Sequence, residues 1–251
     1  MLDDKSFMRY SRQLLLEEVG PEGQQKLSDA RILIVGLGGL GSPAALYLAA
    51  AGAGTLLLAD DDKLHISNLQ RQILYRSSDT GTSKATLAAE ALRALNPSIT
   101  LYAINDRIGV SDQDELPARP TLVLDCSDNL ATRHRVNAWC FSLNIPLITA
   151  SAVGFSGQLL VLTPPWQNGC YQCLWPDARE PERNCRNSGI AGPVVGVMGS
   201  LQALEAIKWI CSGQSSVAGQ LILFDGMALR WRKLQLTPEK NCPICGASHE
   251  H

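Results

Sequence analysis

The sequence predicts an α/β protein built on a Rossmann-like, doubly wound and mostly parallel sheet. Three observations support this fold class. Short apolar runs alternate with helix-forming segments through the first two thirds of the chain. A glycine-rich turn, GLGGLG at residues 36–41, joins one apolar run to a helical segment, and the next apolar run ends in three consecutive aspartates. Strands that alternate with helices pair in parallel because each helix returns the chain to the same end of the sheet.

The composition is that of a globular protein. The chain has 251 residues, of which 45% are apolar and 18% are charged, enough for one large α/β domain or two small ones. A net charge of −2 offers no basic surface for DNA or RNA. We find no apolar window long enough to span a bilayer and no leader-like N-terminus, so we expect a cytoplasmic protein without a membrane partner. In the cytoplasm, eight cysteines indicate metal ligands or reactive thiols before disulfides.

A helix and a βαβ unit are expected in the first part of the chain. Apolar residues at helical spacing predict the N-terminal helix over about Ser6–Glu18. The second strand of the βαβ unit ends at Asp60, and a strong helical segment after it stops at Asn96-Pro97. The expected elements are strands at Ile32–Val35 and Thr55–Ala59, a helix from the glycine turn to about Ala51, and a helix at Lys84–Leu95.

The rest of the chain is expected to complete the sheet and to change character near Pro164. Asp128 or Asn129 is placed to cap the helix that follows the fourth strand. Asp225-Gly226 has the chemistry of a hairpin turn, which predicts an antiparallel extension at the C-terminus. The expected elements are strands at 99–104, 122–124, 147–150, 159–162, 220–224 and 229–236, and a long apolar helix at 194–211.

The glycine turn predicts a nucleotide site. Gly36, Gly38 and Gly41 satisfy the G-x-G-x-x-G pattern, in which glycines let the backbone turn tightly and approach phosphate oxygens. The following helix N-terminus offers free N–H groups to an anion, and Asp60 is placed to accept hydrogen bonds from ribose hydroxyls. The alternative is a tight turn that binds nothing. The turn by itself does not distinguish NAD from ATP.

The loop after Asp60 carries groups that hydride transfer does not need. Asn68, Arg71 and Lys84 lie where the carboxyl ends of the strands are expected to meet. Attack on a phosphate requires cations around the developing charge and a carboxylate to hold Mg²⁺, and Asp128 is a candidate for that carboxylate. Each of these residues alone is more often a solvated surface group.

Two cysteine pairs predict a structural zinc site. Cys170 and Cys173 form one C-x-x-C knuckle, and Cys242 and Cys245 form the other. Redox pairs or disulfides are the alternatives. Cys185 lies apart from these pairs, in a polar segment between Arg183 and Arg186, where the neighbouring cations favour a reactive thiolate. The other three cysteines, Cys126, Cys140 and Cys211, have apolar neighbours and are expected in the core.

Taken together, these motifs resemble the E1-like (ThiF/MoeB/HesA) adenylyltransferases, which activate ubiquitin-like sulfur carriers. The resemblance covers nearly the whole chain. It rests on RYSRQ at 9–13, GLGGLG at 36–41, DDDKLHISNLQRQ at 60–72, Lys84, DCSDN at 125–129, CYQC at 170–173 and CPIC at 242–245. The stretches ITASAVGFSGQLLVLTPP and EPERNCR are most similar to the ThiF branch, with the MoeB branch as the nearest competitor.

The resemblance implies an ATP-dependent reaction in which the carrier's C-terminal glycine carboxylate attacks the α-phosphate and pyrophosphate leaves. It implies one domain over 1–251, with an N-terminal helix at about 1–28, a nucleotide core at about 29–163 and a zinc-knuckle region at about 164–251. Arg12 becomes an arginine finger for a homodimer partner's ATP, Asp128 a ligand of Mg²⁺ and Cys185 the site of a covalent link to the carrier. The implied nucleotide-binding residues are Gly36, Gly38, Gly39, Gly41, Asp60, Asp62, Asn68, Arg71, Gln72, Lys84, Asp128 and Asn129.

Several alternatives stay open at this level. Either Asp60 or Asp62 can hold the ribose, and the carrier can belong to the thiamine or the molybdopterin pathway. Because no rhodanese-like segment follows the second knuckle, we expect a separate protein to supply sulfur. The rival hypotheses are an NAD-dependent oxidoreductase and a non-catalytic scaffold that only docks a ubiquitin-like partner.

Overall fold

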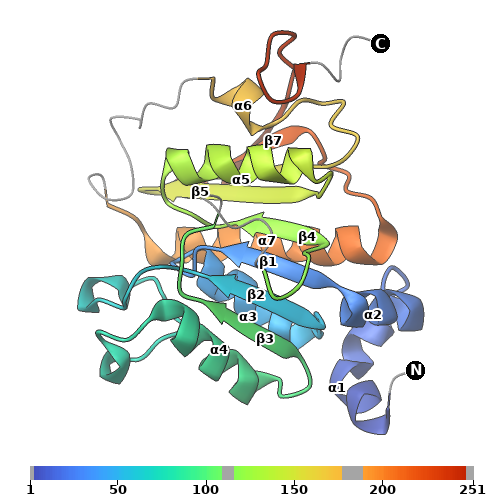
Figure 1. Cartoon of the computed structure of the whole chain (residues 1–251), viewed down its shortest axis with the longest axis vertical. Coiled ribbons are helices and arrows are strands. Elements are labelled where there is room, and N and C mark those ends of the chain that lie inside the picture. The colour runs from blue at the N-terminus through green and yellow to red at the C-terminus, as the bar shows by residue number, and fades with distance from the viewer. Residues whose placement is uncertain (1–2, 109–115, 177–188, 247–251) are drawn as a thin grey trace.

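The fold is a single eight-stranded sheet with helices on both faces (Figure 1). The computed structural model describes residues 3–108, 116–176 and 189–246. In these ranges the strand order is β3-β2-β1-β4-β5-β6-β7-β8. The strands are β1 Arg31–Val35, β2 Thr55–Ala59, β3 Thr100–Ile104, β4 Leu122–Asp125, β5 Leu147–Val153, β6 Ser156–Leu162, β7 Gln220–Asp225 and β8 Arg230–Gln235.

The sheet has a parallel half and an antiparallel half. Strands β1 to β5 pair in parallel, whereas β6, β7 and β8 pair antiparallel to their neighbours. The order of the parallel strands reverses between β1 and β4, and such a switch point leaves a crevice for a ligand at the carboxyl ends of the strands. The predicted doubly wound sheet with an antiparallel C-terminal extension is therefore confirmed.

Alternating side chains of the strands build a core on each face. Ile32 and Ile34 of β1 pack with α3, α4 and α7, while Leu33 and Val35 pack on the side of α5 and the cysteine knuckles. The helices are α1 Asp4–Leu14, α2 Gly20–Asp29, α3 Gly41–Ala51, α4 Lys84–Leu95, α5 Leu130–Ser142, α6 Tyr171–Leu174 and α7 Gly192–Ser212, with 3₁₀ turns η1 Ile66–Asn68 and η2 Ser77–Asp79. Two packed faces make this a typical layered α/β domain.

The N-terminal region differs from the prediction. A single helix was expected over Ser6–Glu18, but α1 ends at Leu14 and a second helix, α2, begins at Gly20. Pro21 occupies the first turn of α2, where its missing N–H and fixed φ are tolerated. This proline is the sequence signal for the second helix start.

The predicted long apolar helix is confirmed as α7. The expectation that no apolar window is long enough to span a bilayer was wrong, because by length and composition α7 is the one helix of the described ranges that could cross one. Half of its most apolar window is buried inside the protein. It packs across β5 and β6 and against α2 and α3. This packing accounts for its apolar composition.

Candidate active site

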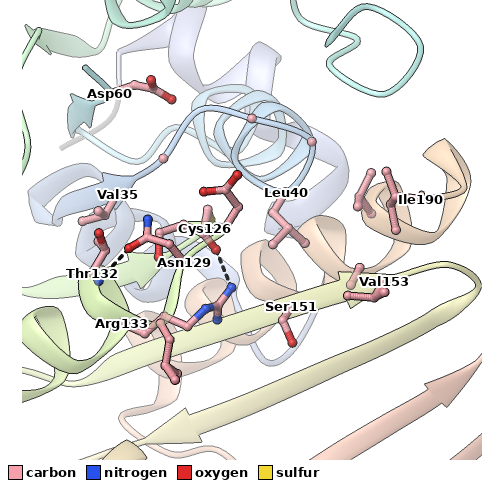
Figure 2. Close-up of a pocket in the computed structure, with 18 of the residues that line it drawn as sticks. Val35, Leu40, Asp60, Cys126, Asn129, Thr132, Arg133, Ser151, Val153 and Ile190 are labelled. Atoms are coloured by element: carbon pink, nitrogen blue, oxygen red, sulfur yellow. Dashed lines mark hydrogen bonds between the residues drawn. The ribbon is translucent and has the colours of Figure 1, made fainter. Parts of the chain in front are cut away.

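A cavity of about 1330 Å³ opens at the switch point between β1 and β4. Its walls come from the glycine turn, the ends of β2 and β4, the start of α5, the β5–β6 hairpin and α6 (Figure 2). Ten of the predicted nucleotide-binding residues line it: Gly36, Gly38, Gly39, Asp60, Asp62, Arg71, Gln72, Lys84, Asp128 and Asn129. The structure thus brings together most of the residues selected from sequence.

The glycine turn requires glycine at two positions for steric reasons. Gly36 has a φ of 89°, and a Cβ there would lie 2.9 Å from the carbonyl oxygen of Cys126. A Cβ on Gly41 would lie 2.0 Å from the carbonyl oxygen of Gly36. The backbone is therefore tightly folded where α3 begins, and the start of that helix faces the cavity floor.

Asp60 contacts the glycine turn directly. Its Oδ2 accepts a hydrogen bond of 2.7 Å from the Leu37 N–H, and its Oδ1 accepts one of 2.9 Å from the Asp62 N–H. Burial raises the pKa of the Asp60 carboxyl, and the nearby Lys84 ammonium and these two N–H groups offset part of the rise. The carboxylate is held in one orientation at the end of β2, beside the turn.

Lys84 is a buried cation with a defined partner. It is the first residue of α4, its side chain is 6% exposed, and its Nζ lies 2.9 Å from Oδ2 of Asp62. The backbone N–H of Lys84 also donates to the Asp62 carbonyl. Asp62, considered above as an alternative ribose ligand, therefore pairs with Lys84, while Asp60 faces the glycine turn.

Of the three predicted residues Asn68, Arg71 and Gln72, the last two line the cavity. Arg71 lines the wall, and its guanidinium donates to the Ser67 carbonyl over 3.2 Å. Gln72 is buried beside Gly38, and its Oε1 has no hydrogen-bond partner among the described residues. A buried acceptor without a partner fits a site that receives a donor group from a ligand.

Asn68 is not among the residues that line the cavity. Its side-chain oxygen accepts a hydrogen bond of 3.0 Å from the His65 N–H, an interaction that caps the 3₁₀ turn η1. In this structure Asn68 therefore shapes the loop that carries Arg71, and a direct contact with phosphate stays a prediction.

The loop from β4 to α5 supplies a carboxylate and a helix cap. Asn129 caps α5 by accepting a hydrogen bond of 2.9 Å from the Thr132 N–H, which decides between the two predicted caps. The Asp128 side chain is exposed at the cavity wall. Mg²⁺ prefers oxygen ligands, and the Asp128 carboxylate offers such oxygens, so the residues present fit this ion.

Arg133 and the uncharged residues of the cavity wall were not predicted from the sequence. Arg133 is buried under the loop, and no local pattern distinguishes it from a solvated helix charge. The other wall residues at positions 151 and beyond carry no charge. These residues are Ser151, Ala152, Val153, Gly154, Phe155, Ser156, Gln158, Tyr171, Leu174, Trp175, Pro176, Ile190 and Val195. Every charged wall residue of the described ranges lies between positions 60 and 133.

Arg12 lies far from the cavity of its own chain. Helix α1 packs under the carboxyl ends of α3 and α4, where Gln13 donates to the Ala51 carbonyl over 2.8 Å and Tyr10 pairs with Asn96. These helix ends lie at the edge of the sheet where β1 and β2 begin, opposite the cavity. Arg12 is exposed there, so any contact with a nucleotide requires another copy of the chain.

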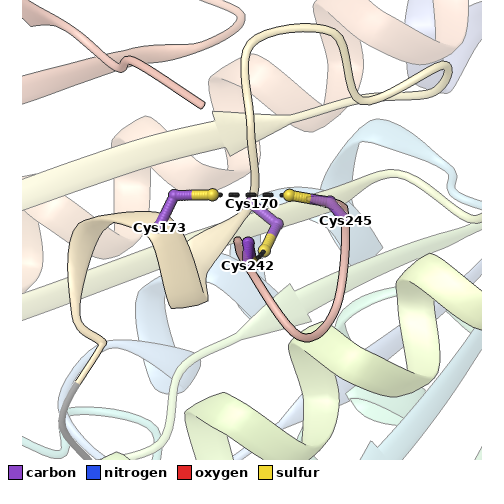
Figure 3. Close-up of side chains that lie close together, drawn as sticks. All are labelled: Cys170, Cys173, Cys242 and Cys245. Atoms are coloured by element: carbon purple, nitrogen blue, oxygen red, sulfur yellow. Dashed lines mark hydrogen bonds between the residues drawn. The ribbon is translucent and has the colours of Figure 1, made fainter. Parts of the chain in front are cut away.

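The two cysteine knuckles meet, as predicted (Figure 3). The four sulfur atoms lie within 4.8 Å of one another, with 3.7 Å between Cys170 and Cys242 and 3.3 Å between Cys173 and Cys245. Zinc–sulfur bonds of about 2.3 Å place tetrahedral thiolates about 3.8 Å apart. The spacing and the Cys₄ donor set fit a closed zinc site, and the sulfurs are too far apart for disulfides.

The remaining cysteines divide as expected where they are described. Cys126, Cys140 and Cys211 are buried. Burial raises the pKa of the Cys126 thiol, which keeps it protonated. Cys185 lies outside the described residues, so its predicted reactivity stays a prediction.

Comparison with known proteins assigns the chain to a family. Residues 10–244 match the model of the ThiF family. The chain belongs to the ThiF family. A ThiF-family relative, the sulfur carrier protein ThiS adenylyltransferase of Escherichia coli K12, is 58% identical over 248 residues, which cover 99% of this chain and 98% of the relative.

More distant relatives also match over nearly the whole of this chain. The molybdopterin-synthase adenylyltransferase of Salmonella typhimurium LT2 is 40% identical, with 98% of each chain covered. Among solved structures, Escherichia coli MccB with ATP has a TM-score of 0.81 and 25% identity, over 95% of this chain and 73% of MccB. The identity to the ThiS enzyme is thus well above that to the molybdopterin enzyme.

Proposed function

We propose that the protein is a nucleotidyltransferase that uses ATP to adenylylate the C-terminal glycine carboxylate of a ThiS-like sulfur carrier, for thiazole formation in thiamine biosynthesis. The observation that carries this proposal is the 58% identity to a ThiS adenylyltransferase over nearly the full length of both proteins. A molybdopterin-type carrier is the second candidate, supported by the 40% identity to that group.

One part of the cavity wall, here called the charged half, carries the charged residues between positions 60 and 133. This half suits ATP. In the proposed complex, the N–H groups at the glycine turn face the phosphates, Asp60 accepts hydrogen bonds from the ribose, and Arg71 and Lys84 neutralise phosphate charge. Asp128 would hold Mg²⁺, which screens the charge of the triphosphate when bound. Lys84 would exchange its partner Asp62 for a phosphate oxygen.

The other part of the wall, here called the uncharged half, consists of the uncharged residues from position 151 onward. This half suits the carrier's tail. A flexible C-terminal Gly-Gly segment presents backbone groups and almost no side chain, and the β5–β6 hairpin with α6 offers a neutral wall for such a strand. The tail's terminal carboxylate would then point toward the charged half. The division of the cavity separates the two substrates by their chemistry.

The reaction follows from this arrangement. A carboxylate oxygen attacks the α-phosphorus, an oxygen–phosphorus bond forms, and the bond to pyrophosphate breaks to leave an acyl-adenylate. A carboxylate is a weak nucleophile, so catalysis depends on alignment of the reactants and on cationic charge around the phosphates. No proton has to move in this step, which agrees with a site whose main groups are fixed charges.

The proposal extends to the assembly. We propose a cytoplasmic homodimer in which Arg12 of one subunit reaches the ATP of the other, zinc at the four cysteines, a separate sulfur donor protein, and Cys185 as the site of a covalent link to the carrier. We also propose one adenylation domain over 1–251, with the nucleotide core at about 29–163.

The decisive experiment is to incubate the protein with ATP, Mg²⁺ and each purified carrier, and to weigh the carrier for an AMP adduct. We expect an adduct on the ThiS-like carrier that disappears in the Lys84→Ala variant. An adduct only on the molybdopterin carrier selects the second candidate. Carrier binding without AMP transfer supports the scaffold hypothesis, and thermal stabilisation by NAD but not by ATP–Mg²⁺ supports the oxidoreductase.

A further inference from the structure

The loop between β4 and α5 is held on one face of the sheet by Gln202 of α7. This glutamine is fully buried, and among the buried residues of α7 only Gln202 and Glu205 are polar. Its Nε2 donates to the carbonyl oxygens of Asp125 and Ile148, over 2.9 and 3.1 Å, and its Oε1 accepts from the Cys126 thiol over 3.3 Å. One side chain therefore joins the end of β4 and the start of β5 to the first residue of the loop.

Arg133 of α5 holds the same loop from the opposite face. Its guanidinium donates to the Ser127 carbonyl and, over 2.9 Å, to the Thr149 hydroxyl, and it lies 3.8 Å from the Asp125 carboxylate. Figure 2 shows Arg133 beneath the loop, next to Asn129. Its side chain is 7% exposed, so these bonds are made away from solvent.

Asp125 contacts both of these residues, Gln202 through its carbonyl oxygen and Arg133 through its carboxylate. The carboxylate is also hydrogen-bonded to the loop and to β5. It accepts hydrogen bonds from the Ser127 N–H, the Ser127 hydroxyl and the Thr149 hydroxyl, at 3.0, 2.6 and 3.0 Å. Asp125 is fully buried, and a buried carboxylate is stable only when it is paired and hydrogen-bonded. A leucine at position 202 would fill the space in α7 without buried polar atoms, so packing alone does not explain this network.

We propose that Gln202 and Arg133 act as positioning residues that fix the Asp128 carboxylate at the place where it holds Mg²⁺ beside the nucleotide. The inference rests on the proposed role of Asp128. Because Asp128 follows Ser127 directly, a shift of the Ser127 carbonyl moves the carboxylate as well. Residues that orient a metal ligand without touching the metal themselves commonly contribute 10- to 100-fold to metal affinity or activity.

The test compares Gln202→Leu and Arg133→Lys with Glu205→Leu as the matched control. Glu205 lies one turn further along α7, is also buried, and contacts Lys208 and Ser215 rather than the loop. Mn²⁺ serves as the probe, and its binding to each protein with a non-hydrolysable ATP analogue is followed by electron paramagnetic resonance. We expect the Mn²⁺ dissociation constant to rise about 10- to 100-fold in the two loop variants. It should change less than about threefold in the control, while metal-free affinity for the analogue stays within about threefold in Gln202→Leu and in the control.

Two outcomes overturn the inference: Mn²⁺ binding as in the wild type in both loop variants, or an equal loss in Glu205→Leu. If Gln202→Leu fails to fold, Arg133→Lys and the size-matched Gln202→Glu decide the question by the same measurement. Wild-type protein that binds Mn²⁺ and the analogue but never adenylylates a carrier disproves the proposed function and leaves the positioning role intact. The two failures are therefore distinguishable.

Discussion

The two halves of the sheet contribute different chemistry to one cavity. The parallel half supplies all of the charged wall residues in the described ranges, between positions 60 and 133. The antiparallel half and the segments beside it supply only uncharged wall residues. The first half is held together by strand pairing and helix packing. In the second half, α6 follows Cys170 and contains Cys173, two of the four clustered cysteines.

This difference explains how a common fold acquires a specific reaction. The carboxyl ends of parallel strands gather side chains at one edge, which suits fixed charges for a phosphate group. Antiparallel strands continue past that edge as a hairpin and offer extended backbone to a second substrate. We therefore expect changes in one half to affect the nucleotide and changes in the other to affect the carrier.

The largest effect is expected from loss of the metal site. In Cys242→Ser/Cys245→Ser only two of the four thiolates remain, and structural zinc commonly contributes about 10–16 kcal/mol to folding. We expect a loss of at least about 5 kcal/mol in the free energy of unfolding and a fall in Tm of about 10–20 °C. Hydrogen exchange should show lost protection in α6 and retained protection in β1 and β2. Full zinc content with an unchanged Tm contradicts the assignment.

The next largest effect concerns the cations of the charged half. Arg71→Ala and Lys84→Ala each remove a positive charge from the proposed phosphate site, and losses of about 10³-fold or more are typical when an arginine that contacts phosphate is lost. We expect carrier-dependent exchange of pyrophosphate into ATP to fall by that factor, with carrier binding nearly unchanged. Near-normal exchange in both variants contradicts the proposed site.

A smaller effect is expected from the partner of Lys84. Asp62→Asn removes the negative charge that lies 2.9 Å from the buried Lys84 ammonium, which leaves the Lys84 side chain less firmly positioned. We expect about a tenfold fall in kcat/KM for ATP, or about 1.4 kcal/mol. Asp61→Asn is the control, because Asp61 pairs with the exposed Arg107 and surface pairs contribute about 1 kcal/mol or less. Equal effects in the two variants show that the Lys84 pair has no special role.

The smallest effect is a pH dependence from Asp60. Burial raises the pKa of this carboxyl above its unfolded value, so the folded protein binds more protons than the unfolded chain between the two pKa values. Stability of the wild type relative to Asp60→Asn should therefore decrease as the pH rises through that window. Denaturant unfolding of both proteins between pH 3.5 and 6 measures this difference, and a rising difference contradicts it.

Much of the fold was predictable because local patterns determine it. Lys84–Leu95 was predicted to the residue, since Ser83 caps its start and Asn96-Pro97 stops it. The break between α1 and α2 was missed because apolar spacing continues through Leu15, and Pro21 was not used as a start signal.

Residues of the site were predictable only where they belong to a recognisable sequence motif. The glycine turn, Asp60, Lys84 and the cysteine pairs stand in recognisable spacings. Gln202 and Arg133 do not, because their partners Asp125 and Ser127 are distant in sequence or become partners only when the loop folds. The charge division of the cavity was also unpredictable, since it depends on which segments meet.

The cysteine cluster also orders events during synthesis of the chain. Cys170 and Cys173 leave the ribosome 72 residues before Cys242 and Cys245. The parallel strands are complete by then and can fold first, because domains tend to fold from the N-terminus as they emerge. A metal ion bound early has only half its ligands, and α6 is secured when residue 245 appears. The charged part of the cavity wall would thus form before α6 completes the uncharged part.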